Sequence, residues 1–421
     1  MRILFLSNFF PPARPGGYTQ WCQEVAERLA GQGHTIGVLT SRYELEKAPA
    51  SEQNIFRLLH LEGDLAYYQP FHFFTRWKEQ HSENLAFLEQ AVTDFAPDLI
   101  FVWGMWALSK TLPALAEKLL PGRVVYYLSD YWPSALDMHT AYWQSPTRHG
   151  PMRVPKRILG KAAMSMLAKE GQPDLKFEHV ICVSARVREL LVEAGLPVQH
   201  ARIIHGGTAI GRFLDVRKRE YSSGCLKLLY AGQLVRHKGV HTAVEAMARL
   251  VNRRKIHQVT LTLVGSGHPE YESYLRQLVE KEHLQDYVIF HKSVSKDQMP
   301  AILQQYDVLI FPSIYEEPLA RMTQEAMASG LVVVGTTTGG TTEILKDGET
   351  GLTFAPEDAD GLTEQVTRLF NDSGLCCRLA QAGRQTVLEN FTLDKMVKEI
   401  EDFLLECFTR SSKVQGFDLE R

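Results

Sequence analysis

The sequence predicts an α/β protein with two doubly wound, parallel-sheet domains. Short apolar runs alternate with longer segments of helical periodicity, as in parallel strands covered by helices on both faces. A polar, glycine-rich stretch interrupts this alternation after about 200 residues, and the pattern then starts again. The chain has 421 residues, which is more than a single hydrophobic core usually serves.

The first half begins with a strand, a loop and a helix. Trp21, Val25 and Leu29 recur at helical spacing within 19–33, which predicts a helix that ends at the glycines of its last turn. Five short apolar runs are the strands predicted for this half, at 3–7, 34–40, 98–103, 123–129 and 179–184.

The second half repeats this arrangement. Its predicted strands are the apolar runs at 226–232, 259–265, 286–290, 307–313 and 331–336. We expect a first domain over 1–205, a hinge over 206–224 and a second domain over 225–391. Residues 392–421 read as a C-terminal helix that ends near residue 408, followed by a tail, and packing of this helix back on the first domain is left open.

Composition and charge disfavour several classes of function. The chain carries 46 basic and 49 acidic residues, a net charge of -3, so nothing global points to nucleic acid as a partner. Its six cysteines show no metal-ligand spacing, which is typical of reduced thiols in a cytosolic protein. No segment approaches the roughly 20 apolar residues that span a bilayer. We therefore expect a cytoplasmic protein without a bound metal.

Two segments bear on targeting. The apolar run at the N-terminus is too short for a signal sequence and is interpreted as a strand. The segment 148–169 is locally basic and is interpreted as a solvated amphipathic helix. A contact of this segment with a lipid surface or an anionic partner is the alternative, so attachment at the periphery of a membrane stays open.

Two carboxylates stand around the start of the helix that follows the strand at 307–313. Glu317 precedes a proline, and such a residue is held extended, so the helix is predicted to begin at or just after Pro318. Glu325 then lies about two helical turns further along, roughly 9–12 Å away.

The helix N-terminus between these two acids predicts an anion site. We expect the free N–H groups of Leu319, Ala320 and Arg321 to point out of the first turn. An acid, a positive helix end and a second acid suit a ligand with hydroxyls at both ends and phosphates between them. A nucleotide sugar is such a ligand.

Cations for the same ligand are predicted on the loop after the strand at 226–232. Arg236, His237 and Lys238 follow that strand, and lysine and arginine there can neutralise a departing diphosphate without a metal ion. In the first half, P-G-G-Y at 15–18 lies between a strand and a helix, where adjacent glycines allow a backbone to approach an anion closely.

Together these motifs resemble those of the retaining glycosyltransferases of family 4, also called glycosyl transferases group 1. The resemblance covers nearly the whole chain, and the E-x7-E spacing with its G-G-x-x-E sequel carries it most specifically. The motifs are P-P-A-R-P-G-G (11–17), V-S-x-x-V-R-E-L-L (183–191), A-G-Q-L-V-R-H-K-G (231–239), L-V-G-S-G (263–267), E-x7-E (317–325) and G-G-T-T-E-I-L-K-D-G-E-T-G-L-T-F (339–354). The resemblance implies the GT-B fold, in which two Rossmann-like domains face a central cleft. In that family the second domain binds a nucleotide sugar and the first an acceptor.

The resemblance also implies roles for residues at matching positions. Glu325 corresponds to the acid that binds the nucleotide ribose, Glu317 to the acid that faces the donor sugar, and Lys238 to the cation on the diphosphate. Arg236 completes the expected catalytic set with Glu317 and Lys238. The further donor-binding residues that it implies are Gly16, Gly17, Gly232, Gln233, Gly265, Leu319 and Ala320.

Acceptor residues are predicted from their position. Asp130, Tyr131 and Trp132 follow the strand at 123–129, at the edge where ligands of such sheets bind. The aromatic cluster at 67–77 is interpreted as half-buried loop packing, with the lining of an acceptor site or a lipid-facing surface as the alternatives. The acceptor class is left open among polysaccharide, lipid-linked sugar, protein and small metabolite.

The chain departs from the family pattern in several places. Gln233 stands where the family usually has an arginine, and Ala320 lies in P-L-A where many members have P-F-G. Where many members carry histidines in the first domain, this chain has Trp103-Gly104 and, further on, Ser129. These departures bear on catalysis more than on the fold.

The sequence therefore predicts a retaining hexosyltransferase that uses a nucleotide sugar, UDP-sugar preferred over GDP-sugar, and no resident cofactor. A non-catalytic nucleotide-sugar-binding protein on the same scaffold and a nucleotide-sugar epimerase of related fold are the alternatives. A dinucleotide-dependent oxidoreductase is disfavoured, because neither domain has G-x-G-x-x-G after its first strand. The donor sugar and the oligomeric state are left open.

Overall fold

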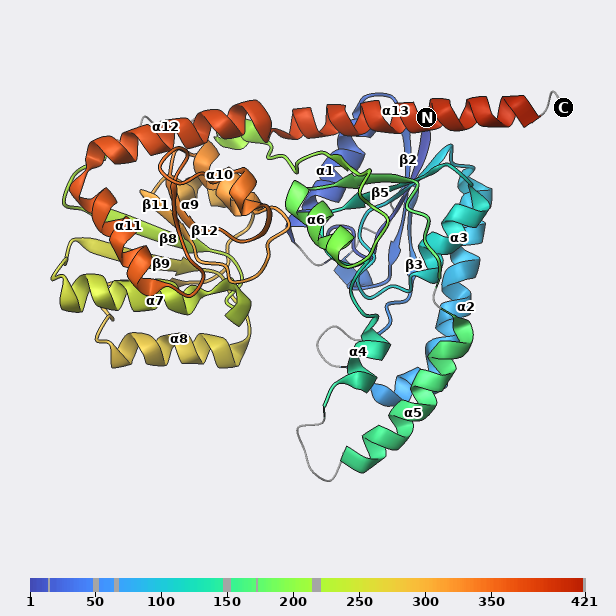
Figure 1. Ribbon diagram of the computed structural model, residues 1–421, viewed down its shortest axis with the longest axis horizontal. Helices are drawn as coiled ribbons and strands as arrows, with labels where there is room; N and C mark the ends of the chain where they lie inside the picture. The colour runs from blue at the N-terminus through green and yellow to red at the C-terminus, as the bar shows by residue number, and fades with distance from the viewer. Residues whose placement is uncertain are drawn as a thin grey trace. The chain divides into compact units, whose positions relative to one another are not determined.

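The computed structural model describes residues 1–13, 16–47, 53–63, 68–146, 153–171, 173–213 and 221–418, and the chain forms two compact units (Figure 1). The first unit comprises Met1–Ile204 together with Val397–Arg421, and the second comprises His205–Met396. Part of the predicted hinge, 214–220, lies outside the described residues, so the hinge stays a prediction.

In the part of the chain that the structure describes, the first unit contains a seven-stranded sheet of order β3-β2-β1-β4-β5-β6-β7, paired in parallel throughout. Its strands are β1 (Arg2–Leu6), β2 (Thr35–Ser41), β3 (Ile55–Leu59), β4 (Leu99–Val102), β5 (Val124–Leu128), β6 (His179–Cys182) and β7 (Arg202–Ile203). The five strands predicted from the apolar runs are confirmed. The sequence analysis missed β3, which carries the charged Arg57, and β7, which has two residues.

Among the described residues, the second unit contains a six-stranded parallel sheet of order β10-β9-β8-β11-β12-β13. Its strands are β8 (Leu226–Ala231), β9 (Val259–Val264), β10 (Val288–His291), β11 (Val308–Phe311), β12 (Val332–Thr336) and β13 (Leu352–Phe354). The five predicted strands are again confirmed, and the three-residue β13 was missed.

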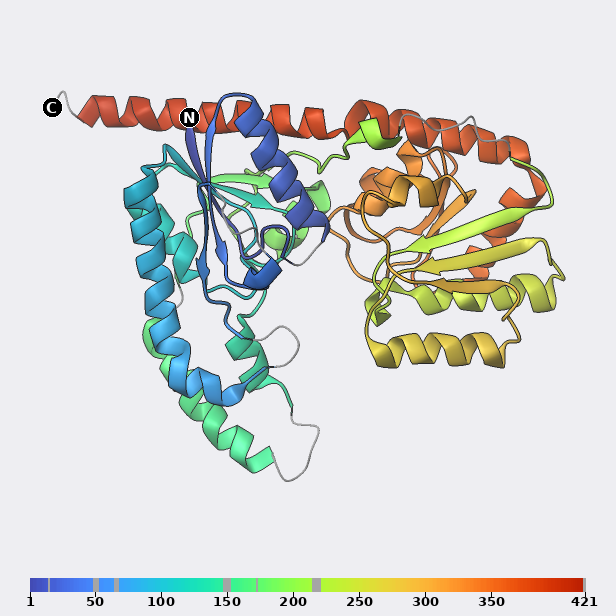
Figure 2. The same ribbon diagram turned by 180° about the vertical axis from the view of Figure 1, so that it is seen from behind.

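Helices cover both sheets. Those of the first unit are α1 (Gly17–Gly31), α2 (Pro70–Phe95), α3 (Thr111–Leu119), α4 (Met138–Gln144), α5 (Arg153–Glu170) and α6 (Ala185–Glu193). Those of the second are α7 (Val240–Ala248), α8 (Pro269–Lys281), α9 (Met299–Leu303), α10 (Arg321–Ala328), α11 (Ala359–Asn371) and α12 (Ser373–Asn390). In the second unit, α7 and α8 lie on one side of the sheet and α10 and α12 on the other (Figures 1 and 2).

Both sheets reverse their strand order at one point, which is where ligands of such sheets usually bind. β1 pairs with β2 on one side and with β4 on the other, and β8 pairs in the same way with β9 and β11. The crevice for a ligand then opens beyond the carboxyl ends of β1 and β4, or of β8 and β11.

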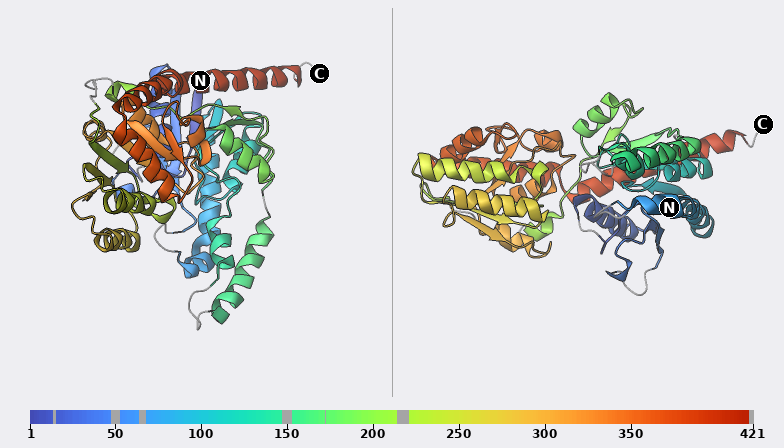
Figure 3. Two further views of the ribbon diagram at one scale, coloured as in Figure 1. Left: turned by 60° about the vertical axis from the view of Figure 1, so that its left-hand side comes forward. Right: turned by 90° about the horizontal axis from the view of Figure 1, so that it is seen from below.

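In the first unit, α2, α4 and α5 extend away from the sheet and form a helical arm (Figures 1 and 3). Phe73, Trp143 and Ala163 are buried where these three helices pack together. The segment interpreted as a loop over 67–77 is therefore largely the first part of α2, which begins at Pro70, and Tyr67 lies outside the described residues. Pro70 suits this place because its fixed φ fits the first turn of a helix.

The basic segment 148–169, predicted as a solvated amphipathic helix, falls partly on α5. Val154 and Ile158 are each 65% exposed on this helix, and Arg157 and Lys161 are exposed beside them. Residues 148–152 lie outside the described part, and contact with a lipid surface stays the alternative. Over the ranges that the structure describes, no helix has both the length and the apolar composition that crossing a membrane requires.

The C-terminal helix α13 (Leu393–Asp418) is longer than predicted, so most of the expected tail is helical. From Val397 onwards it belongs to the first unit, where Glu401 lies 2.8 Å from His34 Nε2. Further along, the guanidinium of Arg202 donates to both carboxylate oxygens of Glu406, at 3.1 and 2.9 Å.

We predict that Gly207→Ala destabilises the second unit. A Cβ at Gly207 would lie 2.2 Å from the carbonyl oxygen of Thr392, and backbone cannot move aside cheaply. The free energy of unfolding should fall by about 3 kcal/mol, measured by urea denaturation. Gly211→Ala is the matched control, because a Cβ there meets no heavy atom within 4 Å. Equal stability of the two variants would contradict this close approach.

Candidate functional site

The predicted cations of the second unit and the first of its two predicted acids lie on two loops at the carboxyl edge of its sheet, whereas Glu325 lies on α10. One loop follows β8 and contains Arg236 and Lys238, and the other follows β11 and contains Glu317. Because β8 and β11 are neighbours at the point where the strand order reverses, the two loops start side by side.

Lys238 and Glu317 form an ion pair across these loops. Lys238 Nζ donates to Glu317 Oε1 at 2.5 Å, and Ser313 Oγ donates to the same oxygen at 2.7 Å. The side chains of Lys238 and Glu317 are 24% and 11% exposed. Within the described residues Glu317 Oε2 has no hydrogen-bond partner, so it can accept a hydroxyl of a ligand.

Close backbone approaches hold this ion pair in place. Gly239 has a left-handed φ of 64°, and a Cβ there would lie 1.9 Å from the carbonyl oxygen of Pro312. The backbone N–H groups of Ile314 and Tyr315 donate to His237 O at 2.9 and 3.1 Å. The loop after β8 is therefore fixed directly against the loop after β11.

A third loop fixes the backbone of Glu317 itself. The N–H of Gly340 donates to Glu317 O at 2.7 Å, and the N–H of Gly339 donates to Glu316 Oε2 at 2.7 Å. Gly339 has a φ of 58°, and a Cβ there would lie 2.0 Å from Glu317 O. The Gly339-Gly340 pair, part of the motif at 339–354, thus positions Glu317 through its backbone contacts.

The predicted start of α10 is wrong. The helix begins at Arg321, because Ala320 has an extended backbone with ψ of 103°. Leu319 and Ala320 therefore lie before the helix, as buried residues of the loop, and their N–H groups do not belong to its first turn. The first helical turn offers the N–H groups of Arg321, Met322 and Thr323 instead.

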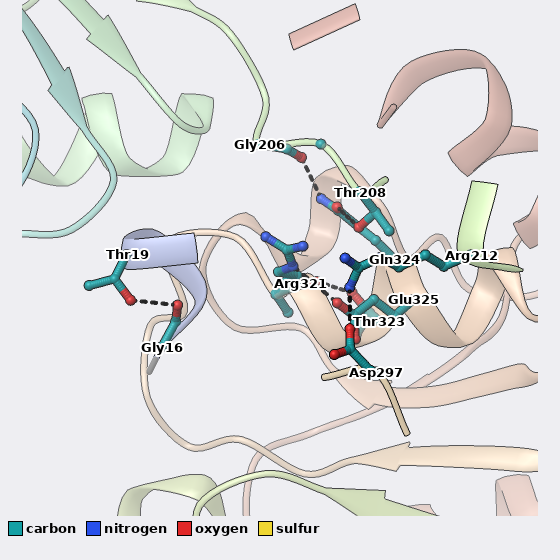
Figure 4. Close-up of polar contacts among 12 residues, drawn as sticks. Gly16, Thr19, Gly206, Thr208, Arg212, Asp297, Arg321, Thr323, Gln324 and Glu325 are labelled. Carbon is teal, nitrogen blue, oxygen red and sulfur yellow. Dashed lines mark hydrogen bonds and ion pairs between the residues drawn. The ribbon is translucent and has the colours of Figure 1, made fainter. Parts of the chain in front are cut away.

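Glu325 has a partner that the sequence analysis did not propose. Arg321 Nε donates to Glu325 Oε1 at 3.0 Å, and the two side chains are 12% and 13% exposed (Figure 4). The spacing of four residues on one helix was a readable signal for this pair. Arg321 therefore orients the carboxylate that we expect to meet a ribose.

Helix α10 is also tied to the segment that opens the second unit. Gln324 is fully buried, and its amide donates to Gly206 O at 2.7 Å and accepts from Thr208 Oγ1 at 2.9 Å (Figure 4). These bonds satisfy a buried amide and fix the register of the segment against the helix.

The remaining donor-side residues lie at the ends of β8 and β9. A Cβ at Gly265 would lie 1.9 Å from Gly232 O, so two backbones touch where these strands end. Gln233 and Arg236 are exposed on the loop that follows. Tyr230 Oη donates to the backbone carbonyl oxygen of Gln233 at 2.7 Å, so this bond does not use the side-chain amide of Gln233.

In the first unit, the glycine loop leads into α1 as predicted. Gly16 is the N-cap residue, and Thr19 Oγ1 donates to its carbonyl oxygen at 2.9 Å (Figure 4). A Cβ at Gly16 would meet only Thr19 Oγ1, at 3.8 Å, so packing does not demand a glycine there. Gly17 is the first residue of the helix.

The predicted acceptor residues occupy the turn after β5. Trp132 is buried, its ring lies near that of Phe177, and its backbone N–H donates to Asp130 Oδ1 at 2.9 Å. Burial raises the pKa of Asp130 to about 6. Trp132 is therefore part of the hydrophobic core. That Asp130, Tyr131 and Trp132 bind an acceptor stays a prediction.

The place of one expected histidine is filled by packing. Trp103 is fully buried, stacks on Tyr127 with ring centroids 4.3 Å apart, and donates from Nε1 to Tyr18 O at 3.0 Å. A Cβ at the next residue, Gly104, would lie 2.7 Å from Asn8 Oδ1. Aromatic packing therefore replaces a polar side chain after β4.

Comparisons with known proteins agree with this arrangement. A model described as Glycosyltransferase Family 4 matches residues 15–212, and one described as Glycosyl transferases group 1 matches residues 215–386. A glycogen synthase of Mycobacterium tuberculosis is 26% identical over 404 residues, which cover 93% of this chain and 91% of that protein. An N-acetyl-alpha-D-glucosaminyl L-malate synthase of Bacillus anthracis is 31% identical over 186 residues, 44% of this chain and 47% of that protein.

Solved structures show the same fold. A sucrose-phosphate synthase of Thermosynechococcus elongatus gives a TM-score of 0.70 at 21% identity, covering 97% of this chain and 99% of that chain. Anabaena HepE in complex with UDP-glucose gives a TM-score of 0.68 at 20% identity, covering 96% and 100%. These similarities confirm the predicted two-domain fold.

We predict that Gly339→Ala disturbs the site far more than a comparable substitution elsewhere. Gly348 is the matched control, because it also has a left-handed φ, 72°, but a Cβ there meets no heavy atom within 4 Å. Gly348→Ala should cost about 1 kcal/mol of unfolding free energy from backbone strain alone, and Gly339→Ala about 3 kcal/mol or more. Chemical denaturation measures both, and equal losses would show that the contact with Glu317 O is unimportant.

Proposed function

We propose that this chain, which belongs to the family 4 glycosyltransferases of GT-B fold, transfers a hexosyl group from a nucleotide sugar. In the proposed reaction the anomeric configuration of that group is retained. The acceptor supplies a hydroxyl group. The observation that carries this proposal is the Lys238–Glu317 ion pair, which joins the loops after β8 and β11 at the switch point of the second sheet. An acid and a cation at that point suit the sugar and the diphosphate of a donor.

Glu325 is the residue that we propose for the ribose. A carboxylate accepts hydrogen bonds from both hydroxyls of a ribose, and the bond from Arg321 holds this one in a fixed orientation. The limited exposure of Glu325 strengthens such bonds, because less water competes for the carboxylate.

Glu317 and Lys238 are the residues that we propose for the donor sugar and the diphosphate. Glu317 Oε2 can accept a sugar hydroxyl while Oε1 keeps Lys238 and Ser313. An ammonium group has three N–H donors, so Lys238 can bind a phosphate oxygen while it stays paired with Glu317. Arg236, exposed on the same loop, supplies a further positive charge near the leaving group.

The proposed reaction places the proton on the leaving group. The bond between the anomeric carbon and the phosphate oxygen breaks, and the acceptor oxygen forms a bond to the same face of that carbon. The proton of the acceptor hydroxyl passes to the departing phosphate oxygen. Negative charge grows on the diphosphate as the bond breaks, so a cation such as Lys238 stabilises the transition state more than the ground state. The step needs neither a protein base nor a resident cofactor.

Uridine is the base that we favour for the donor. This preference is supported by the UDP-glucose bound to Anabaena HepE, which shares the fold of this chain. A guanosine donor is the alternative, as in the GDP-mannose-dependent mannosyltransferase of Mycobacterium tuberculosis that is 27% identical over 238 residues.

A non-catalytic nucleotide-sugar-binding protein remains the second candidate. It is favoured by Trp103 and Gly104, which fill the place of an expected histidine, and by Gln233 in place of an arginine. Both candidates require the same donor site, so only turnover separates them.

Transfer assays with UDP-glucose, UDP-N-acetylglucosamine and GDP-mannose test the proposed function. We expect at least one donor to be consumed with a saccharide acceptor, and the product to keep the donor's anomeric configuration in proton NMR. A product of inverted configuration would contradict retention. Tight binding of a donor without turnover, across a broad panel of acceptors, would favour the non-catalytic protein.

Glu325→Ala should weaken donor binding by about 1.5–3 kcal/mol, roughly 10- to 150-fold in Kd, because the ribose hydroxyls lose a charged acceptor. Calorimetric titration with UDP measures this loss. Glu364→Ala is the control, since Glu364 is also a helical glutamate paired with an arginine, Arg254, but lies on α11. An unchanged affinity in Glu325→Ala would refute the ribose role.

Lys238→Ala should lower kcat by about 10²–10³-fold and change the Kd of the donor much less, since the stabilisation by Lys238 grows as the diphosphate leaves. Thermal unfolding checks that the variant stays folded despite the loss of the partner of Glu317. Lys281→Ala provides the control, because that lysine is largely exposed on α8. A full rate in Lys238→Ala would exclude the charge role.

A further inference from the structure

The first unit contains two adjoining cavities beside the helical arm. Their volumes are about 170 and 770 Å³, and the larger lies within the range of ligand pockets, about 300–1,000 Å³. The residues that line both are Glu62, Trp77, His81, Ser109 and His139. We name the two together the arm cavity.

The arm cavity lies at the edge of the sheet where a ligand is expected. Glu62 follows β3, Ser109 follows β4, and His139 lies in α4, which follows β5. β4 and β5 are neighbours in the sheet, whereas β3 is its edge strand, but all three positions lie at or beyond the carboxyl edge, where ligands of doubly wound sheets bind. Asp130, Tyr131 and Trp132 line neither cavity.

His139 presents an unpaired polar atom to the arm cavity. Its side chain is buried, with only 3% of the residue exposed, and Tyr68 Oη lies 2.7 Å from its Nδ1. Its Nε2 has no hydrogen-bond partner among the described residues. Burial lowers the pKa of His139 to about 4, so the ring is neutral. A neutral imidazole nitrogen either donates or accepts, and a buried one without a partner calls for a hydrogen bond from a ligand or water.

Glu62 supplies the complementary group. Its Oε2 accepts the N–H of Met138 at 3.0 Å, and burial, then the charge of Asp137, raises its pKa to about 7. Lys110 faces the same region and donates to the carbonyl oxygens of Pro133 and Ala135 at 2.6 and 2.9 Å. The polar wall thus combines a carboxyl group with an unpaired imidazole nitrogen, with charges of both signs nearby.

Trp77 gives both cavities an aromatic surface. Its ring stacks on that of Phe73, which lines the smaller cavity, with centroids 5.0 Å apart. An aromatic wall with a few fixed polar groups is the usual composition of a site for a small organic ligand. In the described part of the chain, no three side chains of metal-ligating type cluster closely enough to hold a metal ion.

These features select a neutral, polyhydroxylated ligand. A hydroxyl group both donates and accepts, so it can donate to Glu62 and serve His139 Nε2 at once, whereas an ammonium only donates. Asp137 and Lys110 place charges of opposite sign beside these groups, so the region does not favour a ligand of one charge. The apolar C–H face of a sugar ring can pack against the aromatic wall.

We propose that the arm cavity binds the acceptor and that the acceptor presents a neutral sugar ring there, between Glu62, His139 and Trp77. This inference rests on the proposed function and adds to it the chemical class of the acceptor. The acceptor-binding residues are then drawn from three strand ends and the helical arm rather than from the turn after β5.

Binding of neutral sugars to the full chain, without nucleotide, tests this proposal. The probes are methyl α-D-glucopyranoside, lactose and maltotriose, titrated while ligand-observed NMR reports binding. We expect at least one probe to bind and its affinity to fall at least tenfold in Glu62→Ala and in Trp77→Leu. Glu62→Gln keeps an acceptor for the N–H of Met138 and should retain most of the binding. Glu189→Gln on α6 is the control, since this glutamate is exposed and lines neither cavity.

The possible outcomes distinguish a failure of the arm-cavity proposal from a failure of the proposed donor site. Binding of UDP that is lost in Glu325→Ala, with no binding of any sugar probe, would overturn the arm cavity as a sugar site and leave the proposed function intact. Sugar binding that is unchanged in Trp77→Leu, whose ring is only half-buried and whose replacement should fold, would overturn it as well. Binding of glucosamine with exclusion of all neutral probes would contradict the neutral class.

Discussion

The ion pair between Lys238 and Glu317 is the interaction on which the site of the second unit depends. A carboxylate with 11% of its side chain exposed is costly to bury without a cation, and the cation comes from a loop 79 residues away in sequence. The glycines at 239 and 339 allow the three loops to approach within backbone contact, so the acid and the cation meet at a fixed separation. The same approaches leave Glu317 Oε2 open to a ligand. The geometry of the candidate site and the local stability therefore rest on the same contacts, and a substitution that weakens these contacts should affect both.

Most of the fold was predictable because parallel strands buried on both faces read as continuous apolar runs. β3 was not predicted because Arg57 interrupts its apolar pattern. In the structure the guanidinium of Arg57 donates hydrogen bonds to the carbonyl oxygens of Phe10 and Pro11. The start of α10 was misplaced for a different reason. A proline restricts only the residue before it, here Glu317, whereas the extended backbone of Ala320 is set by tertiary contacts that no local rule reports.

The candidate site was predictable in part. The sequence indicated Glu317, Glu325 and Lys238 because each lies just beyond a strand or on the helix that follows, and parallel strands bring such positions to one edge. It did not indicate that Lys238 and Glu317 pair with each other, because that contact depends on the order of the strands in the sheet. The arm cavity left no local signal, since Glu62, Ser109 and His139 follow three different strands and meet only in the folded unit.

The measurement that tests the account most directly is a crystal structure of the full chain with UDP bound. The account predicts that a diphosphate oxygen lies within hydrogen-bond distance of Lys238 Nζ while the Lys238–Glu317 contact persists, and that the ribose hydroxyls lie on Glu325. A UDP molecule bound elsewhere on the second unit, away from Lys238 and Glu325, would contradict it. So would a diphosphate that draws Lys238 away from Glu317, since the ion pair would then be only a resting-state contact.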